Sequence, residues 1–175
     1  MITHIPISCD APDFSREHKP FLTWDPGRSL ISSLRKYQRL NGSAGPFSLI
    51  RKWFAVLTHR FWSAVSGADI PLNSKIGGGL LLPHPNGIVI HPDAVIGPNC
   101  LIFQQVTIGT RGTGGVPAIG GHVDIGAGAK VLGSIRIGNH VVIGANAVVL
   151  QDVPDNCMAV GIPAIVKPLG GRLNQ

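Results

Sequence analysis

The residues best suited to chemistry are a histidine and an aspartate placed around a break in a regular repeat. His84 opens the segment His84-Pro85-Asn86-Gly87, and Asp69 lies earlier, directly before Ile70. A neutral imidazole is a suitable general base near pH 7, and a carboxylate on its other nitrogen would fix the tautomer and stabilise the imidazolium. Two interpretations of His84 are open at this point: a catalytic base, or a loop histidine that faces water.

The elements that must position this pair form a repeat in which an aliphatic residue returns at every sixth position. This period belongs neither to a helix nor to a simple strand, and it is typical of hexapeptide β-helix repeats. The pattern predicts an all-β solenoid of short strands, with an aliphatic stack inside and turns that glycine relieves.

Three six-residue faces per coil divide the aliphatic series into three walls. Asp69 precedes the first-wall residue Ile70 and His84 follows the third-wall residue Leu82, so both should occupy the corner that joins those walls. Stacked strands lie about 4.8 Å apart, so side chains on successive coils are within reach of each other. The predicted walls are Ile70, Ile90, Ile108, Val131 and Val149; Ile76, Ile96, Ile119 and Ile137; and Leu82, Ile102, Ile125 and Ile143.

Two interruptions of the repeat predict loops, which in solenoids often lie on the binding face. The first is Pro83–Gly87, and the second is the glycine-rich segment Thr110–Pro117, which carries Arg111. We expect three parts in the chain: an N-terminal arm over 1–66, the solenoid over 67–168 and a C-terminal tail over 169–175.

The arm is expected to be extended over 1–23 and then to contain two helices. Asp25-Pro26 is a good helix start and Asn41-Gly42 a good stop. A second helix is predicted over 46–66, with an apolar stripe at helical spacing. We favour packing of this stripe on the end of the solenoid, where it would hide unpaired strand edges; contact with anionic lipid is the alternative. The stripe consists of Phe47, Ile50, Phe54, Leu57, Phe61 and Val65.

Charge and cysteines limit the classes of function. The net charge of +6 lies mostly in residues 1–66, which carry +5; a solvated basic face accounts for this as well as a partner surface does. Cys9, Cys100 and Cys157 are too scattered for a metal knuckle or a redox pair and indicate free thiols in a reducing compartment. We see no secretory leader and no run long enough to span a membrane, so we expect a cytoplasmic protein, with contact to the inner membrane face through 46–66 as the alternative.

The run from Gly67 to Val166 resembles the serine acetyltransferases of the hexapeptide acyltransferase superfamily. The resemblance implies a left-handed parallel β-helix, a homotrimer with active sites between subunits, and acetyl transfer from acetyl-CoA to a hydroxyl. It also implies that His84 is the general base and that Asp69 orients it. The matching stretches are 68–70, 75–77, 84–90, 104–109, 125–133 and 161–164.

Further site residues follow from the same resemblance. Coenzyme A would lie against the small residues Gly126, Ala127, Gly144 and Ala145, although small residues also suit tight corners. Lys130 or Lys167 would supply charge for its phosphates, because the sequence reads Pro163-Ala164-Ile165 where the family has Pro-Ala-Arg. Asn86, Gln104 and Arg111 are the expected substrate contacts.

The acceptor is where the sequence departs from the serine enzymes. Pro83 stands where they carry an aspartate, and Gly114–Pro117 stands where they carry Asp-Arg-His-Pro. A pocket without those charges has little to hold a zwitterion. The closer resemblance is to exopolysaccharide-type O-acetyltransferases, and it rests on the segment Ile108–Gly112 and on the short basic arm. We therefore expect the acetyl acceptor to be a hydroxyl of a sugar, either free or lipid-linked.

Three alternatives remain beside the sugar acetyltransferase. The first is a serine O-acetyltransferase. The second is a carbonic-anhydrase-like metal protein built on His122 and His140, which the repeat stacks on one outer face. The third is a non-catalytic β-helix that binds a partner. We expect no metal and no nucleic-acid partner.

Overall fold

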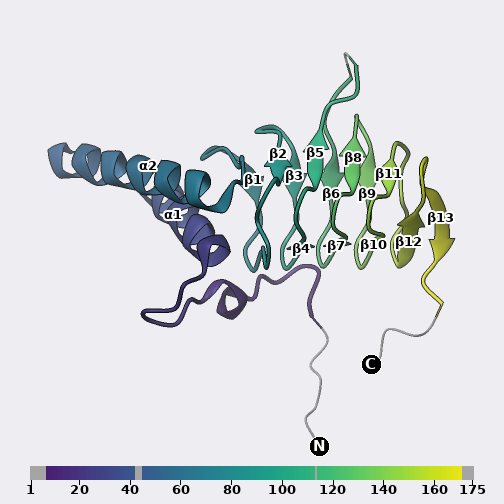
Figure 1. Cartoon of the computed structure of the whole chain (residues 1–175), viewed down its shortest axis with the longest axis horizontal. Coiled ribbons are helices and arrows are strands. Elements are labelled where there is room, and N and C mark those ends of the chain that lie inside the picture. Colours follow the sequence, from purple (N-terminus) through teal and green to yellow (C-terminus); the bar gives the residue numbers. More distant parts are fainter. Residues whose placement is uncertain (1–6, 42–44, 113, 171–175) are drawn as a thin grey trace, which may run out of the picture.

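The computed structural model describes residues 7–41, 45–112 and 114–170 of the chain. It is a solenoid with two helices at one end and the last strand at the other (Figure 1). Residues 1–6 of the expected arm, Gly42 of the helix stop, Thr113 of the second loop and residues 171–175 of the expected tail lie outside the description.

Three parallel sheets form the walls of the solenoid, and their register matches the predicted walls. Ile90 pairs with Ile108, and Ile108 pairs with Val131, so each buried aliphatic residue contacts its equivalent in the next coil. The arrangement fits the left-handed parallel β-helix that the resemblance implies. The first wall holds β2 (Val89–Ile90), β5 (Thr107–Gly109), β8 (Lys130–Leu132) and β11 (Val148–Val149); the second holds β1 (Lys75–Ile76), β3 (Val95–Ile96), β6 (Ala118–Ile119) and β9 (Arg136–Ile137).

The third wall contains β4 (Leu101–Ile102), β7 (Asp124–Ile125), β10 (Val142–Ile143), β12 (Cys157–Val160) and β13 (Ile165–Pro168). All its pairings are parallel except the last, because β13 turns back and pairs antiparallel with β12. This hairpin covers the C-terminal edge of the third wall, which would otherwise present unpaired backbone groups.

Helix α1 (Pro26–Leu40) begins and ends where the sequence predicts. The Asp25 carboxylate accepts a hydrogen bond from the Arg28 backbone N–H at 2.9 Å, which is an N-cap. Leu30 and Leu34 are fully buried in the core against the first coil. Gly27 must be glycine, because a Cβ there would lie 2.2 Å from the carbonyl oxygen of Leu82.

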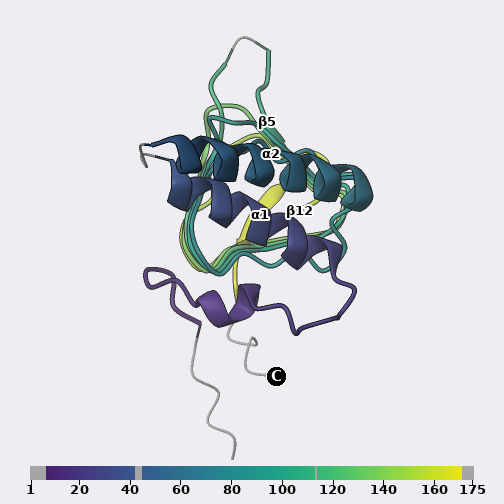
Figure 2. The ribbon, with the colours of Figure 1, turned by 90° about the vertical axis from the view of Figure 1, so that its left-hand side faces the viewer.

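Helix α2 (Pro46–Ser66) exists as predicted, but its apolar stripe faces the other way. The side of α2 that packs against α1 and the first coil carries Ala55, His59 and Ser66, all buried. The favoured packing of the stripe on the solenoid is therefore wrong. A helical period reveals that a face is apolar but not which surface it meets. Both helices lie across the end of the coil (Figure 2), and α2 meets it with the side that carries His59 and Ser63. The stripe residues Phe47, Ile50, Phe54, Leu57, Phe61 and Val65 are all exposed.

Polar side chains of the two helices, rather than apolar ones, cap the open edge of the first coil. Each donates a hydrogen bond to a backbone carbonyl that has no preceding coil to pair with, which satisfies groups that would be costly to bury unpaired. The pairs are Arg35 with Ile76 and Gly77, Gln38 with Ser74, His59 with Ile70, and Ser63 with Ala68.

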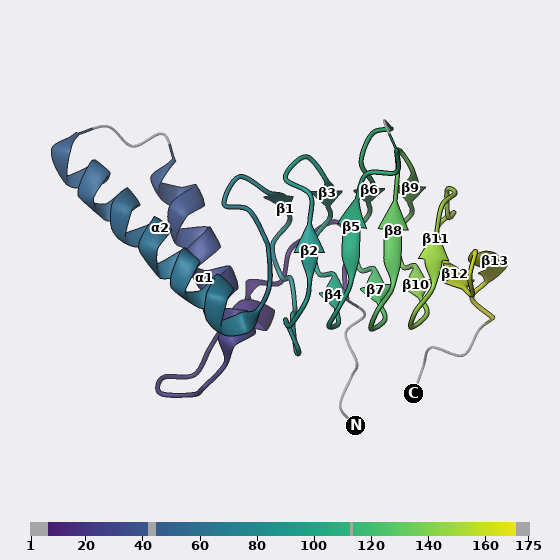
Figure 3. The same cartoon turned by 45° about the horizontal axis from the view of Figure 1, so that its top comes forward.

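The segment before α1 is not simply extended, as we expected, but folds back across the solenoid. It contains a short 3-10 helix, η1 (Phe14–Glu17), capped by Asp13. The Asn99 side chain holds the segment: its Nδ2 donates to the carbonyls of Ser8 and Ala11, both at 2.8 Å, and its Oδ1 accepts from the Asp13 N–H. Figure 3 shows this segment passing behind the first strands.

Candidate active site

Asp69 and His84 lie at the corner between the third and first walls. The Asp69 N–H donates to the Ile88 carbonyl at 2.8 Å, and the Gly87 N–H donates to the Gly67 carbonyl at 2.8 Å. The segment that carries Asp69 therefore runs beside the segment that follows His84, and Asp69 forms an isolated parallel bridge with Val89. Both side chains are exposed, and in the described part of the chain they make no hydrogen bond to each other.

The same corner is built in the following coils by residues that the resemblance implicates. The Gln105 N–H donates to the Asn86 carbonyl at 2.9 Å, and the Gly128 N–H donates to the Gln104 carbonyl at 2.8 Å. Lys130 reaches back to this column, where its Nζ donates to the Gln105 carbonyl at 2.6 Å. Asn86, Gln104 and Lys130 thus lie along one edge of the solenoid, on the coils after His84.

Gln104 carries an acceptor with no partner among the described residues. Its Oε1 is buried, yet it accepts no hydrogen bond. A buried acceptor without a partner costs about 1–3 kcal/mol. A donor from a bound molecule or a neighbouring chain could pair with this atom only after the Gln104 side chain turns outward.

The small residues expected against coenzyme A continue this edge. The Asn146 N–H donates to the Ala127 carbonyl at 2.8 Å, which places Ala145 one coil beyond Ala127. A Cβ on Gly126 would lie 2.6 Å from the backbone nitrogen of Ala145, and one on Gly144 would lie 2.8 Å from Cγ1 of Val160. Close stacking of coils therefore requires glycine at position 126, whereas at position 144 a Cβ would have to displace the Val160 side chain.

Two predicted site residues lie away from His84 within one chain. Arg111 belongs to the loop after β5, at the opposite end of the first wall, and this loop projects from the solenoid at the top of Figure 1. Lys167 lies on β13, opposite Met158, at the far end of the solenoid from the first coil. A single chain therefore does not assemble all the predicted site residues around His84.

Asp69 also lines a cavity that no sequence pattern indicates. The cavity, about 540 Å³, lies between the second half of α2 and the first coil, and Arg60, Ser63 and Leu72 contribute to it. No periodicity predicts this contact, because it depends on how α2 docks. Helix α2 thus borders the candidate site on the side of Asp69.

His122 and His140 stack on successive coils, as their spacing predicts, but at a different corner. Their Nδ1 atoms are 2.8 Å apart, so one nitrogen donates a hydrogen bond to the other. Burial lowers the pKa of His122, while the nearby Asp124 carboxylate partly opposes this shift. Among the described residues, no group of three or more histidine, cysteine or acidic side chains is arranged to hold a metal ion.

The cysteines offer no activated nucleophile in the described part of the chain. Cys100 is buried, and burial raises its pKa to about 11, so the thiol stays protonated near neutral pH. Cys9 and Cys157 are also free thiols. Cys100 is therefore poorly suited to act as a nucleophile.

Comparisons with known proteins agree on one group of enzymes. No family model matches the chain. The serine acetyltransferase of Synechococcus elongatus is 46% identical over 105 residues, which are 58% of this chain and 43% of that protein. A serine acetyltransferase of Brucella abortus, solved in complex with coenzyme A, superposes with a TM-score of 0.71 at 34% identity, over 85% of this chain and 58% of that one.

A third similar protein is the serine acetyltransferase of Neisseria gonorrhoeae solved in complex with serine. It superposes with a TM-score of 0.67 at 38% identity, over 81% of this chain and 57% of that one. The chain is thus similar in sequence and fold to serine acetyltransferases, while it spans only about half the length of these relatives.

Proposed function

We propose that the protein is an acetyl-CoA-dependent O-acetyltransferase. The observation that carries the proposal is the single edge of the solenoid that holds Asp69 and His84 in its first coils and the small residues Ala127 and Ala145 further on. The similarity to serine acetyltransferases, one of them solved with coenzyme A, supports it.

In the proposed reaction His84 is the general base and Asp69 its positioning residue. The imidazole takes the proton of the acceptor hydroxyl while the hydroxyl oxygen bonds to the thioester carbonyl carbon. The carbon–sulfur bond then breaks, and the imidazolium returns the proton to the departing thiolate, which yields the acetyl ester and free coenzyme A. A positioned base of this kind contributes about 10²–10⁴-fold in rate.

Coenzyme A would lie along the same edge, with Gly126, Ala127, Gly144 and Ala145 facing its pantetheine arm. With its side chain turned outward, Gln104 can accept a hydrogen bond through its unpaired Oε1 from one of the two amide N–H groups of that arm. Lys130, already turned toward this edge, and Lys167 can contribute positive charge for the phosphates.

The proposed active unit is a homotrimer, with each site between two chains. Arg111 and Lys167 are distant from His84 within one chain, so they can serve a site only if it is shared with a neighbouring copy. The exposure of His84, of residues 110–112 and of Gly114 and Gly115 in the single chain is consistent with such sharing.

For the acceptor, the comparisons favour L-serine over the sugar that the sequence led us to expect. The relatives are serine acetyltransferases, and none of those compared acts on polysaccharide by its name. One observation still keeps a neutral hydroxyl acceptor as the second candidate. The segment around His84 and the described part of the second loop offer no carboxylate for an ammonium group, and Arg111 is their only cation.

The test is release of free thiol from acetyl-CoA, with and without candidate acceptors. The panel contains L-serine, homoserine, free sugars, and nucleotide-linked and lipid-linked sugars. We expect acceptor-dependent thiol release, with L-serine the best substrate. Release with sugars but not with serine would restore the neutral acceptor, and no release with any hydroxyl compound would overturn the acetyltransferase proposal.

A further inference from the structure

The outward surface of α2 is a continuous apolar face. Six of its large side chains, Phe47, Ile50, Trp53, Phe54, Leu57 and Phe61, are between 50% and 80% exposed. They follow one another at helical spacing along the helix, and the opposite side of α2 carries the buried Ala55, His59 and Ser66. A contiguous exposed face of aromatic and aliphatic residues marks an interaction site rather than ordinary surface.

The helical hairpin that carries this face is exclusively cationic. Between Pro26 and Ser66 the sequence has seven Lys and Arg residues and no Asp or Glu. Arg28 and Arg35 are paired with Asp25 and Glu17, which lie before the hairpin. Among the described residues, no ion pair joins Lys36, Arg39, Arg51 or Arg60 to a carboxylate. The remaining cations are Lys36, Arg39, Arg51, Lys52 and Arg60.

Three of these cations converge on a groove between α1 and α2. The groove, about 430 Å³, is lined by Lys36 and Arg39 of α1 and by Arg51 of α2. Phe54, from the apolar face, lines the same groove. Apolar and cationic groups therefore meet at one edge, which is an arrangement suited to a ligand with an anionic head next to a hydrocarbon region.

We propose that the α1–α2 hairpin docks on an anionic phospholipid surface. The apolar face of α2 enters the boundary between headgroups and acyl chains, and lipid phosphates bind Lys36, Arg39 and Arg51 in the groove. A second copy of the chain is a poorer occupant, because two hairpins of this charge would bring cations against cations with no carboxylate on either side.

The helix lies along the membrane surface in this arrangement. No helix in the described residues is long and apolar enough to cross a membrane. Binding should therefore be reversible and depend on both contributions: apolar insertion, and attraction to anionic headgroups that salt weakens.

The test is co-sedimentation of the full-length protein with lipid vesicles. One set contains phosphatidylcholine alone, and a second contains phosphatidylcholine with phosphatidylglycerol. We expect binding to the second set only, with loss at high salt. Each cation removed should weaken binding about fivefold, so Arg39→Gln with Arg51→Gln should weaken it about 25-fold. At equal ionic strength, inorganic phosphate should reduce vesicle binding no more than sodium chloride does.

Matched substitutions separate the apolar face from general surface effects. Phe54→Glu, on the face, should abolish vesicle binding. Ile165→Glu, at the other end of the solenoid, changes a side chain of similar exposure, 63% against 67%, and should leave binding intact. Both substitutions replace exposed side chains, so circular dichroism should show that both variants fold as the unaltered protein does. A second readout of binding is the tryptophan fluorescence, which should shift to the blue when vesicles are added. This shift should be absent in Trp53→Phe.

Three results would overturn the proposal. One is equal binding to neutral and anionic vesicles. Another is unchanged vesicle binding in Phe54→Glu. The third is a smaller assembly in sedimentation velocity for Phe54→Glu but not for Ile165→Glu, which would show that the face joins copies of this chain. None of these results bears on acetyl transfer, so the two proposals fail independently.

Discussion

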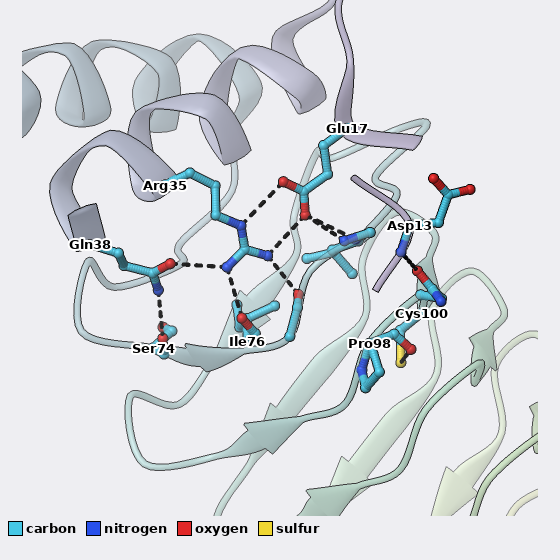
Figure 4. Close-up of polar contacts among 12 residues, drawn as sticks. Asp13, Glu17, Arg35, Gln38, Ser74, Ile76, Pro98 and Cys100 are labelled. Atoms are coloured by element: carbon cyan, nitrogen blue, oxygen red, sulfur yellow. Dashed lines mark hydrogen bonds and ion pairs between the residues drawn. The ribbon is translucent and has the colours of Figure 1, made fainter. Parts of the chain in front are cut away.

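Arg35 and Glu17 form a two-pronged ion pair that joins three parts of the chain. Arg35 Nη2 lies 2.9 Å from Glu17 Oε1, and Nε lies 3.2 Å from Oε2 (Figure 4). The guanidinium also donates to the carbonyl of Ile76, and Glu17 accepts from the N–H groups of Gly79 and Leu80. The pair thus ties η1 and α1 to the open edge of the first coil.

Removing the Arg35 side chain should therefore be costly. Arg35→Met leaves the nearly buried Glu17 carboxylate uncompensated and the capped carbonyls unpaired, so we expect a loss of about 3–5 kcal/mol in the free energy of unfolding. Arg28→Met is the matched control, because the Arg28–Asp25 pair is more exposed, and it should cost at most about 1 kcal/mol. Denaturant titration measures both losses. Equal losses would show that the Arg35–Glu17 pair contributes no more to stability than the exposed Arg28–Asp25 pair.

Glycine at position 126 should be required for stacking. In Gly126→Ala the new methyl group would press on the backbone of Ala145, which cannot move without disturbing the next coil. We expect a loss of about 1–3 kcal/mol or more in the free energy of unfolding. Gly109→Ala, where a Cβ meets nothing within 4 Å, should be nearly neutral. A tolerated alanine at 126 would mean that the coils are less tightly packed there.

The free energy of unfolding should decrease as the pH falls below the pKa of an ordinary histidine. His59 is buried, with Nε2–H donating to the Ile70 carbonyl at 2.8 Å and Nδ1 3.0 Å from Ser33 Oγ. Burial lowers the pKa of His59, and the Ile70 hydrogen bond only partly opposes this. Below about pH 6.5 the unfolded chain therefore binds more protons than the folded one, and the free energy of unfolding decreases as the pH falls.

The variant His59→Gln should reduce this pH dependence, measured by thermal unfolding on either side of pH 6.5. Some dependence should remain, because burial also lowers the pKa of His122. An identical slope in His59→Gln and the unaltered protein would show that His59 does not carry the effect.

The solenoid could be predicted because the six-residue repeat of the sequence assigns each aliphatic residue to one wall and one coil. Ile90, Ile108 and Val131 stack as expected, since one buried aliphatic per six residues leaves only one register. The cap of α1 was equally predictable, because Asp25-Pro26 is a local signal. The corner shared by Asp69 and His84 followed from counting coils.

Contacts between distant segments gave no such signal. Neither the Arg35–Glu17 pair nor the Asn99 contacts follow from any local pattern, since each depends on how one segment folds across another. The direction of the α2 face was predicted wrongly for the same reason. The cavity beside Asp69 and the free Oε1 of Gln104 also emerge only after the helices have docked and the coils have stacked.

Asp69→Asn should lower kcat much more than it raises KM. The amide keeps the shape of the side chain but cannot stabilise an imidazolium, so we expect a loss on the order of 10²–10⁴-fold in kcat. Stability should hardly change, because the side chain is exposed and its backbone N–H still bonds to Ile88. An unaltered kcat would remove Asp69 from the proposed pair.

The most direct measurement is acetyl transfer by His84→Ala beside His91→Ala. His84 lies at the Asp69 corner, whereas His91 follows β2 on the other side of the first wall, so the two variants remove the same side chain from different corners. We predict that His84→Ala loses at least about 10²-fold in acceptor-dependent thiol release while it still binds coenzyme A, and that His91→Ala retains activity. Full turnover by His84→Ala would contradict the assignment of the general base, and with it the proposed mechanism.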